Sequence, residues 1–272
     1  MRLLIIGCGS IGSTLAKALD NMPEVDLIYI TDKNRGCTAD LVKKLRKVRS
    51  VGNTEMDLDS IAKEVNIVVE AASQEAAKHY VPFFLERGVD VMVLSVGAFA
   101  DEKFRDKCFQ LAREKNSRIY VPSGAITGTD GLRSASTGKI DEVILVTTKG
   151  PNSLKSVEYF KKKRIDFDAI KEPMIVFEGT AREAAANFPK NMNVAATVSL
   201  LGVGFDKTKV RIICDPRSER NRHTLIVKGS FGEITSTTEN VPFPNNPSTS
   251  YLAALSAISA LRRIITNIWI GI

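Results

Sequence analysis

The hydrophobic pattern of residues 1–126 alternates between short apolar runs and longer segments with helical spacing. Each apolar run has the length of a buried strand, and the segments between them carry apolar residues three and four positions apart, as the buried faces of helices do. The clearest runs are VDLIYITD, NIVVEAAS, VDVMVLSVGAF and RIYVPSG. Strands that alternate with helices favour a parallel sheet with helices on both faces. Residues 1–126 are therefore predicted to form a Rossmann-type doubly wound parallel sheet of the α/β class.

After residue 126 the pattern changes to strands with few helices between them. Strand-like runs occur in KIDEVILVTTKGP, EPMIVFEG, KVRIICDP and HTLIVKGSFGEITSTTEN, and one helical stretch, AREAAANFPKNMNVAATVSLLG, interrupts them. This pattern predicts a second, mixed α/β open-sheet domain over residues 127–246. The last segment, 247–272, is strongly apolar and predicts a helix that returns to pack on the first domain.

The segment LLIIGCGSIGSTLAKAL places Gly7, Gly9 and Gly12 between a predicted strand and a predicted helix. In that context the GxGxxG spacing is typical of a dinucleotide site. The first glycine makes the turn, the second lets the backbone approach a pyrophosphate, and the third lets helix and strand pack closely. Ser13 to Leu19 continues as a helix, and a helix N-terminus favours negative charge. Because glycines cluster in many turns, the triplet alone is a weak signal.

Asp32 ends the next apolar run, at the position where a carboxylate accepts hydrogen bonds from the adenosine ribose. A surface aspartate is the plainer alternative, but the register with the glycines favours the ribose. The charge of Asp32 would repel a 2′-phosphate and so favours NAD over NADP, whereas Lys33 and Arg35 leave NADP open. Ligands of such sheets bind at the carboxyl ends of the strands. The loops there supply further candidates for cofactor binding, namely Ala71, Ala72, Ser95 and Gly97.

Composition and charge exclude other classes of protein. With 44% hydrophobic and 7% aromatic residues, the chain is typical of a globular protein. The net charge is +7, but the basic runs KKLRKVR and KKKR contain no aromatic residue and are typical of solvated faces, so no nucleic-acid partner is expected. No secretion signal and no apolar run long enough to cross a bilayer is recognised. These features predict a cytoplasmic protein without a membrane partner.

The four cysteines, at positions 8, 37, 108 and 214, form no CxxC pair. They also show no ligand-like spacing to the two histidines. Neither a metal site nor a disulfide framework is therefore expected.

The two histidines differ in their surroundings. His79 lies in a predicted helix beside Tyr80, which is typical of a packing or surface residue. His223 follows the turn-rich DPRSERNR and opens a predicted strand. Because an imidazole titrates near pH 6.5, it can take and give a proton at cellular pH, as an amino or hydroxy acid dehydrogenase requires. Position alone favours neither a catalytic nor a structural His223.

Several segments together resemble the L-aspartate dehydrogenase family. They are GCGSIG, VEAASQEA, PSGAITGTDGLRSASTGKIDEVILVTTKGP, FEGTAREAAANFPKNMNVAAT, DPRSERNRHTLIVKGSFGEI and NPSTSYLAALSA. They follow one another in the order of that family and cover almost the whole chain. The resemblance implies a catalytic and dimerisation domain over residues 127–246, and a homodimer.

The resemblance also implies roles for individual residues. His223 falls on the acid/base histidine of the family, and Ala125 and Asn191 fall on positions that bind the nicotinamide cofactor. Gly9, Ser10, Ile11 and Asp32 fall on the dinucleotide fingerprint. In NPSTS, Ser248 stands where a lysine is expected, which puts a substrate-binding role of that loop in doubt. Because a dicarboxylate needs two anion sites, the substrate candidates are Lys190, Arg222 and the helix start near Thr249.

The implied reaction is the oxidation of L-aspartate by NAD+ or NADP+ to iminoaspartate, which water hydrolyses to oxaloacetate and ammonia. The family further suggests delivery of iminoaspartate to a quinolinate synthase, in NAD biosynthesis. Two alternatives stay open. One is a related oxidoreductase of the homoserine dehydrogenase or dihydrodipicolinate reductase type, and the other is a module that senses NAD without turnover.

Overall fold

The chain divides into two compact units. The first comprises Met1–Pro122 with Ala254–Trp269, and the second is mainly Ser123–Ala253. This computed structural model describes all residues except 156, 189–191, 244–245, 267 and 271–272, and for 247–248 it describes the backbone only. The first boundary thus lies at Pro122 rather than at residue 126, and the C-terminal segment joins the first unit from Ala254 rather than from residue 247.

The first unit contains a six-stranded parallel sheet with the strand order β3-β2-β1-β4-β5-β6. The strands are β1 (Arg2–Ile6), β2 (Leu27–Thr31), β3 (Val48–Ser50), β4 (Ile67–Glu70), β5 (Asp90–Val93) and β6 (Ile119–Tyr120). The order reverses between β1 and β4, and ligands of such sheets bind at that switch point, beyond the carboxyl ends of the strands. The predicted fold class is confirmed.

Helices connect these strands. They are α1 (Ser10–Asp20), α2 (Arg35–Lys44), α3 (Glu55–Ala62), α4 (Gln74–Glu86), the 3₁₀ helix η1 (Val96–Ala100) and α5 (Glu102–Glu114). The side chains of Asn34, Thr54, Ser73 and Asp101 accept hydrogen bonds from the first turns of α2, α3, α4 and α5. Each cap satisfies backbone N–H groups that have no partner inside the helix. These helix starts are therefore fixed by local sequence.

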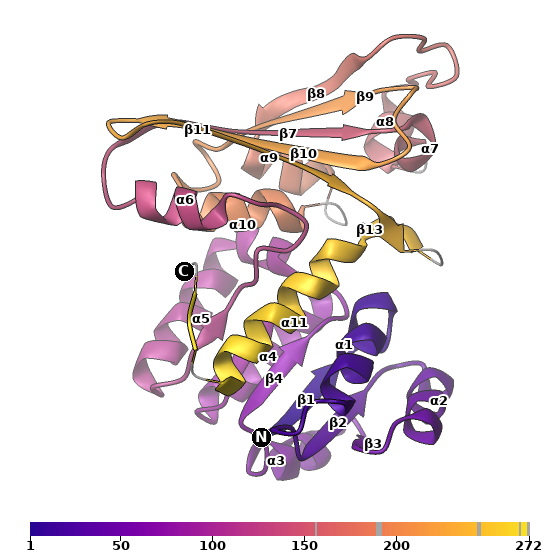
Figure 1. Ribbon diagram of the computed structural model, residues 1–272, viewed down its shortest axis with the longest axis vertical. Coiled ribbons are helices and arrows are strands. Elements are labelled where there is room, and N and C mark those ends of the chain that lie inside the picture. Colours follow the sequence, from indigo (N-terminus) through magenta and orange to yellow (C-terminus); the bar gives the residue numbers. More distant parts are fainter. Residues whose placement is uncertain (156, 189–191, 244–245, 267, 271–272) are drawn as a thin grey trace. The chain divides into compact units, whose positions relative to one another are not determined.

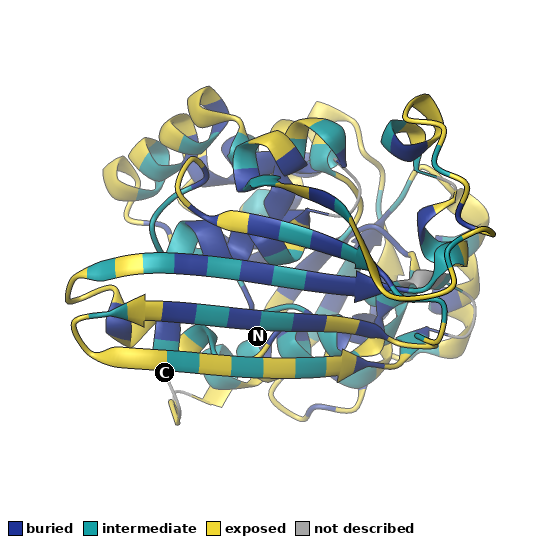
Figure 2. Cartoon of the chain, turned by 90° about the horizontal axis from the view of Figure 1, so that it is seen from above, coloured by how far each residue is buried: buried dark blue, intermediate teal, exposed yellow. Residues whose placement is uncertain are grey.

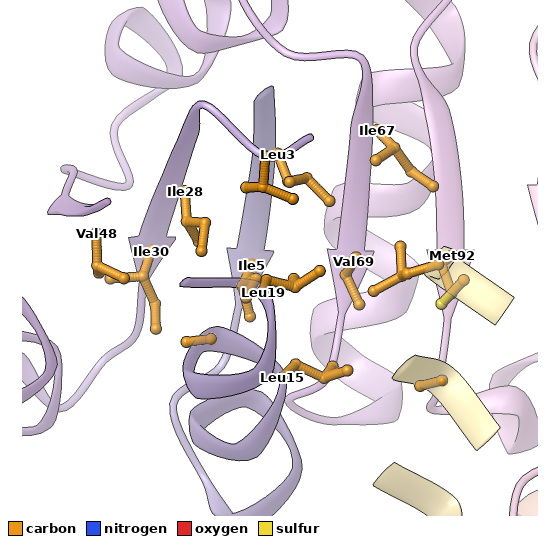
Figure 3. Close-up of a cluster of buried hydrophobic side chains, with 14 of the residues drawn as sticks. Leu3, Ile5, Leu15, Leu19, Ile28, Ile30, Val48, Ile67, Val69 and Met92 are labelled. Atoms are coloured by element: carbon orange, nitrogen blue, oxygen red, sulfur yellow. The ribbon is translucent and has the colours of Figure 1, made fainter. Parts of the chain in front are cut away.

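One face of the parallel sheet carries a continuous apolar core (Figure 3). Alternate residues of five strands, such as Leu3 and Ile5 of β1, point into this cluster together with Leu15 and Leu19 of α1. The last helix, α11 (Tyr251–Thr266), adds Ala257 and Leu261. On the other face α4 packs against β4, β5 and α5. Burial of both faces explains why the central strands β1 and β4 are almost entirely apolar.

The second unit is built on a five-stranded mixed sheet with the order β11-β10-β7-β9-β8. Its strands are β7 (Ile140–Lys149), β8 (Met174–Thr180), β9 (Lys209–Cys214), β10 (Asn221–Gly229) and β11 (Gly232–Asn240); β12 (Pro242–Phe243) pairs separately with β13 (Asn246–Ser250). Its helices are α6 (Thr129–Ala135), α7 (Pro151–Leu154), α8 (Glu158–Lys162), α9 (Ala181–Asn187) and α10 (Asn193–Leu201).

The helical stretch expected over 181–202 is two helices rather than one. Phe188, which follows α9, has φ −132° and ψ 52° and leaves the helical region. The next residue in the sequence is a proline, which disfavours the helical conformation of the residue before it.

Only one face of the mixed sheet is covered by helices. α6, α9 and α10 lie along it (Figure 1). Buried and partly exposed residues alternate along β7, β9 and β10 accordingly (Figure 2). In the described part of the second unit, no element covers the opposite face. The catalytic candidate His223 lies on the covered face.

Candidate active site

The glycine loop after β1 is closely packed at Gly7 and Gly12 and open at Gly9. Gly7 has φ +103°, and a Cβ there would lie 2.6 Å from the carbonyl oxygen of Ala71. A Cβ on Gly12 would lie 1.9 Å from the Gly7 oxygen, so only glycine allows α1 to approach β1 this closely. In contrast, a Cβ on Gly9 would meet no atom within 4 Å. The protein therefore leaves open space at Gly9, where α1 starts at Ser10 without a side-chain cap.

Asp32 is held beside this loop at the carboxyl end of β2. Its two carboxylate oxygens accept hydrogen bonds from the backbone N–H groups of Cys8 and Asn34, both at 2.7 Å. Asp32 also lines a cavity of about 490 Å³ together with Lys33 and Arg35. The cavity carries one carboxylate and two cationic side chains, which suits the adenosine half of a dinucleotide and fits either NAD or NADP.

We predict that Asp32→Asn shifts cofactor preference towards NADP+. The substitution removes the charge that repels a 2′-phosphate and weakens hydrogen bonds to ribose hydroxyls, which are worth about 1.5–3 kcal/mol when the acceptor is charged. The KM for NAD+ should rise on the order of tenfold, and the ratio of kcat/KM for NADP+ to that for NAD+ should rise by at least as much. Steady-state kinetics with both cofactors measures this, and an unchanged ratio would remove Asp32 from the ribose site.

Cys8 and Cys37 form a disulfide between the glycine loop and α2, with the Cα atoms 6.2 Å apart. The expectation that the chain contains no disulfide is therefore wrong. Sequence spacing could not predict this pair. Cys8 follows β1 and Cys37 follows β2, and the two cysteines come close because these strands are adjacent and parallel. Cys108 and Cys214 are buried free thiols, and burial raises the pKa of both.

The disulfide predicts the number of reactive thiols. Alkylation of the protein unfolded without reductant should modify two cysteines, and alkylation after reduction should modify four. Intact mass and peptide mapping measure this, with Cys37→Ala as the control in which three thiols react without reductant. Four modified cysteines in the unreduced wild type would contradict the pairing.

Glu70 holds the next two loops of the cofactor site together. This buried carboxylate at the end of β4 accepts hydrogen bonds from the N–H groups of Ala72, Ser73 and Ser95 at 2.8–3.1 Å, and from the Ser95 hydroxyl at 2.9 Å. Burial raises the pKa of Glu70, and the hydrogen bonds oppose this effect. The predicted cofactor-binding residues Ala71 and Ala72 lie in the loop after β4. Ser95 and Gly97 lie after β5. Glu70 was missed by the sequence analysis, although it is the one charged residue in its apolar run.

His223 is buried on the covered face of the mixed sheet, with 7% of its surface exposed. Its Nδ1 atom lies 3.0 Å from the hydroxyl of Thr147, its partner across the β10–β7 pair. Burial, with a smaller contribution from the positive charge of Lys149, lowers the pKa of His223 to about 3. The ring is therefore neutral at cellular pH. When Nδ1–H donates to Thr147, the Nε2 lone pair can accept a proton.

Lys149 is a second functional candidate and was missed by the sequence analysis. It ends β7 on the same face as Thr147 and is 8% exposed. Burial lowers the pKa of its ammonium group. The signal in the sequence was a lysine at the end of the apolar run VILVTTK, which is unusual because lysine is seldom fully buried.

The remaining candidates are distributed over the second unit. The carbonyl oxygen of the buried Ala125 accepts a hydrogen bond from Asn240 Nδ2 at 2.9 Å. Thr249 accepts one from Asn246 Nδ2, also at 2.9 Å. Arg222 is not brought to His223: adjacent strand residues point to opposite faces, and Arg222 forms an ion pair with Glu239 at 2.7 Å on the uncovered face. Lys190 and Asn191, and the side chain of Ser248, lie outside the described residues.

The described residues contain no group of three His, Cys, Asp or Glu side chains that could hold a metal ion. None of their helices combines the length and apolar character that a membrane span needs.

Comparisons with known proteins cover the whole chain. The family models "Homoserine dehydrogenase, NAD binding domain" and "Aspartate dehydrogenase, C-terminal" match residues 7–122 and 130–264. The L-aspartate dehydrogenase of Methanococcoides burtonii is 46% identical over 100% of this chain and 99% of that protein. The L-aspartate dehydrogenase of Nitrosopumilus maritimus is 40% identical over 98% of this chain and 97% of that protein. The crystal structure of aspartate dehydrogenase from Thermotoga maritima is 32% identical, with a TM-score of 0.77 over 100% of this chain and 99% of that chain.

Proposed function

Because the chain belongs to the L-aspartate dehydrogenase family, we propose that it oxidises L-aspartate with NAD+ or NADP+ to iminoaspartate. The single observation that carries this proposal is the neutral, buried His223 in a chain that matches L-aspartate dehydrogenases over its full length. The open space at Gly9 and the fixed carboxylate of Asp32 support binding of the dinucleotide.

In the proposed mechanism the chain binds, orients and moves a proton. The bound cofactor supplies the hydride acceptor for the substrate α-carbon. His223 Nε2 accepts the proton that leaves the substrate amine, or the one released when water attacks the imine. Thr147 holds the ring through Nδ1 and so fixes the tautomer. Glu70 fixes the loops that carry Ala72 and Ser95 at the dinucleotide end.

The experiment that tests this function is reduction of NAD+ and NADP+ by the purified protein. L-aspartate is compared with D-aspartate, L-glutamate, L-alanine and L-homoserine. We expect turnover with L-aspartate only. Turnover with L-homoserine instead would favour the alternative that the first family model suggests, and cofactor binding without any turnover would favour a sensor.

We propose that two copies of the chain associate through the uncovered face of the mixed sheet. This face carries the partly exposed Ile144, Val146, Ile213 and Ile226, and Ile175 with 49% of its surface exposed. An apolar patch across four strands is uncommon on a monomer. Light scattering should give twice the 29.8 kDa mass of the chain, and Ile226→Glu should halve it. A monomeric wild type would contradict the homodimer.

We further propose that the protein works in the cytoplasm and delivers iminoaspartate to a quinolinate synthase. The support is chemical, because an imine is hydrolysed in water and is useful only if a second enzyme captures it. Deleting the gene should lower the quinolinate supply of the cell. An unchanged supply would contradict this role.

A further inference from the structure

Lys149 is the most buried cation in the described part of the chain. It is the one lysine or arginine there whose exposed fraction falls to 8% or less. Lys209 of the same sheet is exposed in contrast, and it pairs with Glu142 at 2.7 Å. A buried ammonium group is costly to desolvate and is retained where it meets an anion or a polar group. Lys149 is therefore a cation held at a cost on the face of the sheet that also carries His223.

The strand register places Lys149 next to His223. His223 lies opposite Thr147, and Lys149 is two residues further along β7 on the same face. Diagonal neighbours of an antiparallel pair are about 7–8 Å apart, within reach of a long side chain. The charge of Lys149 acts on the imidazole in agreement with this geometry. An anion held by Lys149 would thus lie beside the proton acceptor.

The surroundings of Lys149 strengthen such a contact. Lys149 and Thr147 are the polar residues of a cavity of about 30 Å³, whose other walls include Leu154, Phe160 and Phe188. Apolar walls exclude water, and attraction between opposite charges is stronger there than at the surface. The cavity has room for about two water-sized groups, such as the two oxygens of one carboxylate, and not for a whole amino acid.

We infer that Lys149 binds a carboxylate of the dicarboxylate substrate and so positions the substrate α-carbon beside His223. This inference rests on the proposed function. Substrate binding would also change the basicity of His223, because the negative carboxylate offsets the positive charge of Lys149 that acts on the imidazole. His223 then becomes a stronger base when the substrate is present.

The test compares Lys149→Met with Lys209→Met, which removes an exposed cation from the neighbouring strand. The readouts are KM and kcat for L-aspartate, inhibition by the dicarboxylate succinate, and the Kd of NADH. In Lys149→Met, KM for L-aspartate and the inhibition constant of succinate should rise on the order of ten- to a hundredfold, as for a lost charged hydrogen bond. The Kd of NADH should stay within about twofold of wild type. Lys209→Met should change none of these.

Other outcomes would overturn the inference. An unchanged KM and succinate constant in Lys149→Met, or a lower kcat alone, would show that Lys149 does not bind the substrate. An equal rise in the Kd of NADH would show a general structural defect instead. If thermal unfolding shows that Lys149→Met is not folded, Lys149→Gln serves for the same comparison. A wild type that does not oxidise L-aspartate would overturn the proposed function itself, which the wild-type assay reveals separately.

Discussion

Replacing His223 by alanine is expected to lower kcat for L-aspartate oxidation by about 10²- to 10⁴-fold, the usual contribution of a positioned acid/base group. The pKa of His223 is lowered to about 3, mainly by burial, so the ring is neutral from about pH 5 to 8, and it takes up a proton when a bound negative charge raises that pKa. The chain has one other histidine, His79, which is exposed on α4.

His79→Ala is the matched control, since it removes the second imidazole of the chain and should leave kcat unchanged. The Kd of NADH should be the same in both variants and the wild type. Added imidazole should restore part of the activity of His223→Ala, because it can occupy the space of the lost ring. A kcat within about threefold of wild type for His223→Ala would show that the proton goes elsewhere.

The sequence predicted those features that depend on neighbouring residues. The glycine loop, the strand that ends at Asp32 and the alternation of strands and helices are local patterns, and the parallel sheet confirms the fold class. The continuous helix expected over 181–202 is divided because Phe188 leaves the helical region. Apolar periodicity does not show such an interruption, since both helices carry similar residues.

Features that depend on distant residues were not predicted. The Cys8–Cys37 disulfide and the contacts of Glu70 with Ser95 join different βα units. Lys149 gains its place near His223 only through the pairing of β7 with β10. Arg222 is the converse case, because proximity in sequence to His223 suggested a shared site, whereas the pleat of β10 turns the two side chains to opposite faces.

Two glycine substitutions should separate the stability of the glycine loop from its binding of the cofactor. Gly12→Ala places a Cβ 1.9 Å from the backbone oxygen of Gly7, so α1 and β1 must move apart. We expect the free energy of unfolding to fall by about 1–3 kcal/mol or more, which is the usual cost of an overpacked core. The melting temperature should fall by roughly 2–4 °C for each kcal/mol lost. The variant should therefore be less stable than the wild type and should bind NADH more weakly.

Gly9→Ala is the matched variant, because its Cβ would meet no protein atom within 4 Å and its φ of −65° suits alanine. The loss of stability should stay near 1 kcal/mol or less, which is about the usual difference between glycine and alanine at an N-cap. If the open space at Gly9 receives the pyrophosphate, the added methyl group occupies part of it, and the Kd of NADH should rise by at least about tenfold. Fluorescence titration and thermal unfolding of both variants measure the two effects. A Gly9→Ala protein that binds NADH as the wild type does would show that the dinucleotide does not approach the backbone there, even if Gly12→Ala unfolds as expected.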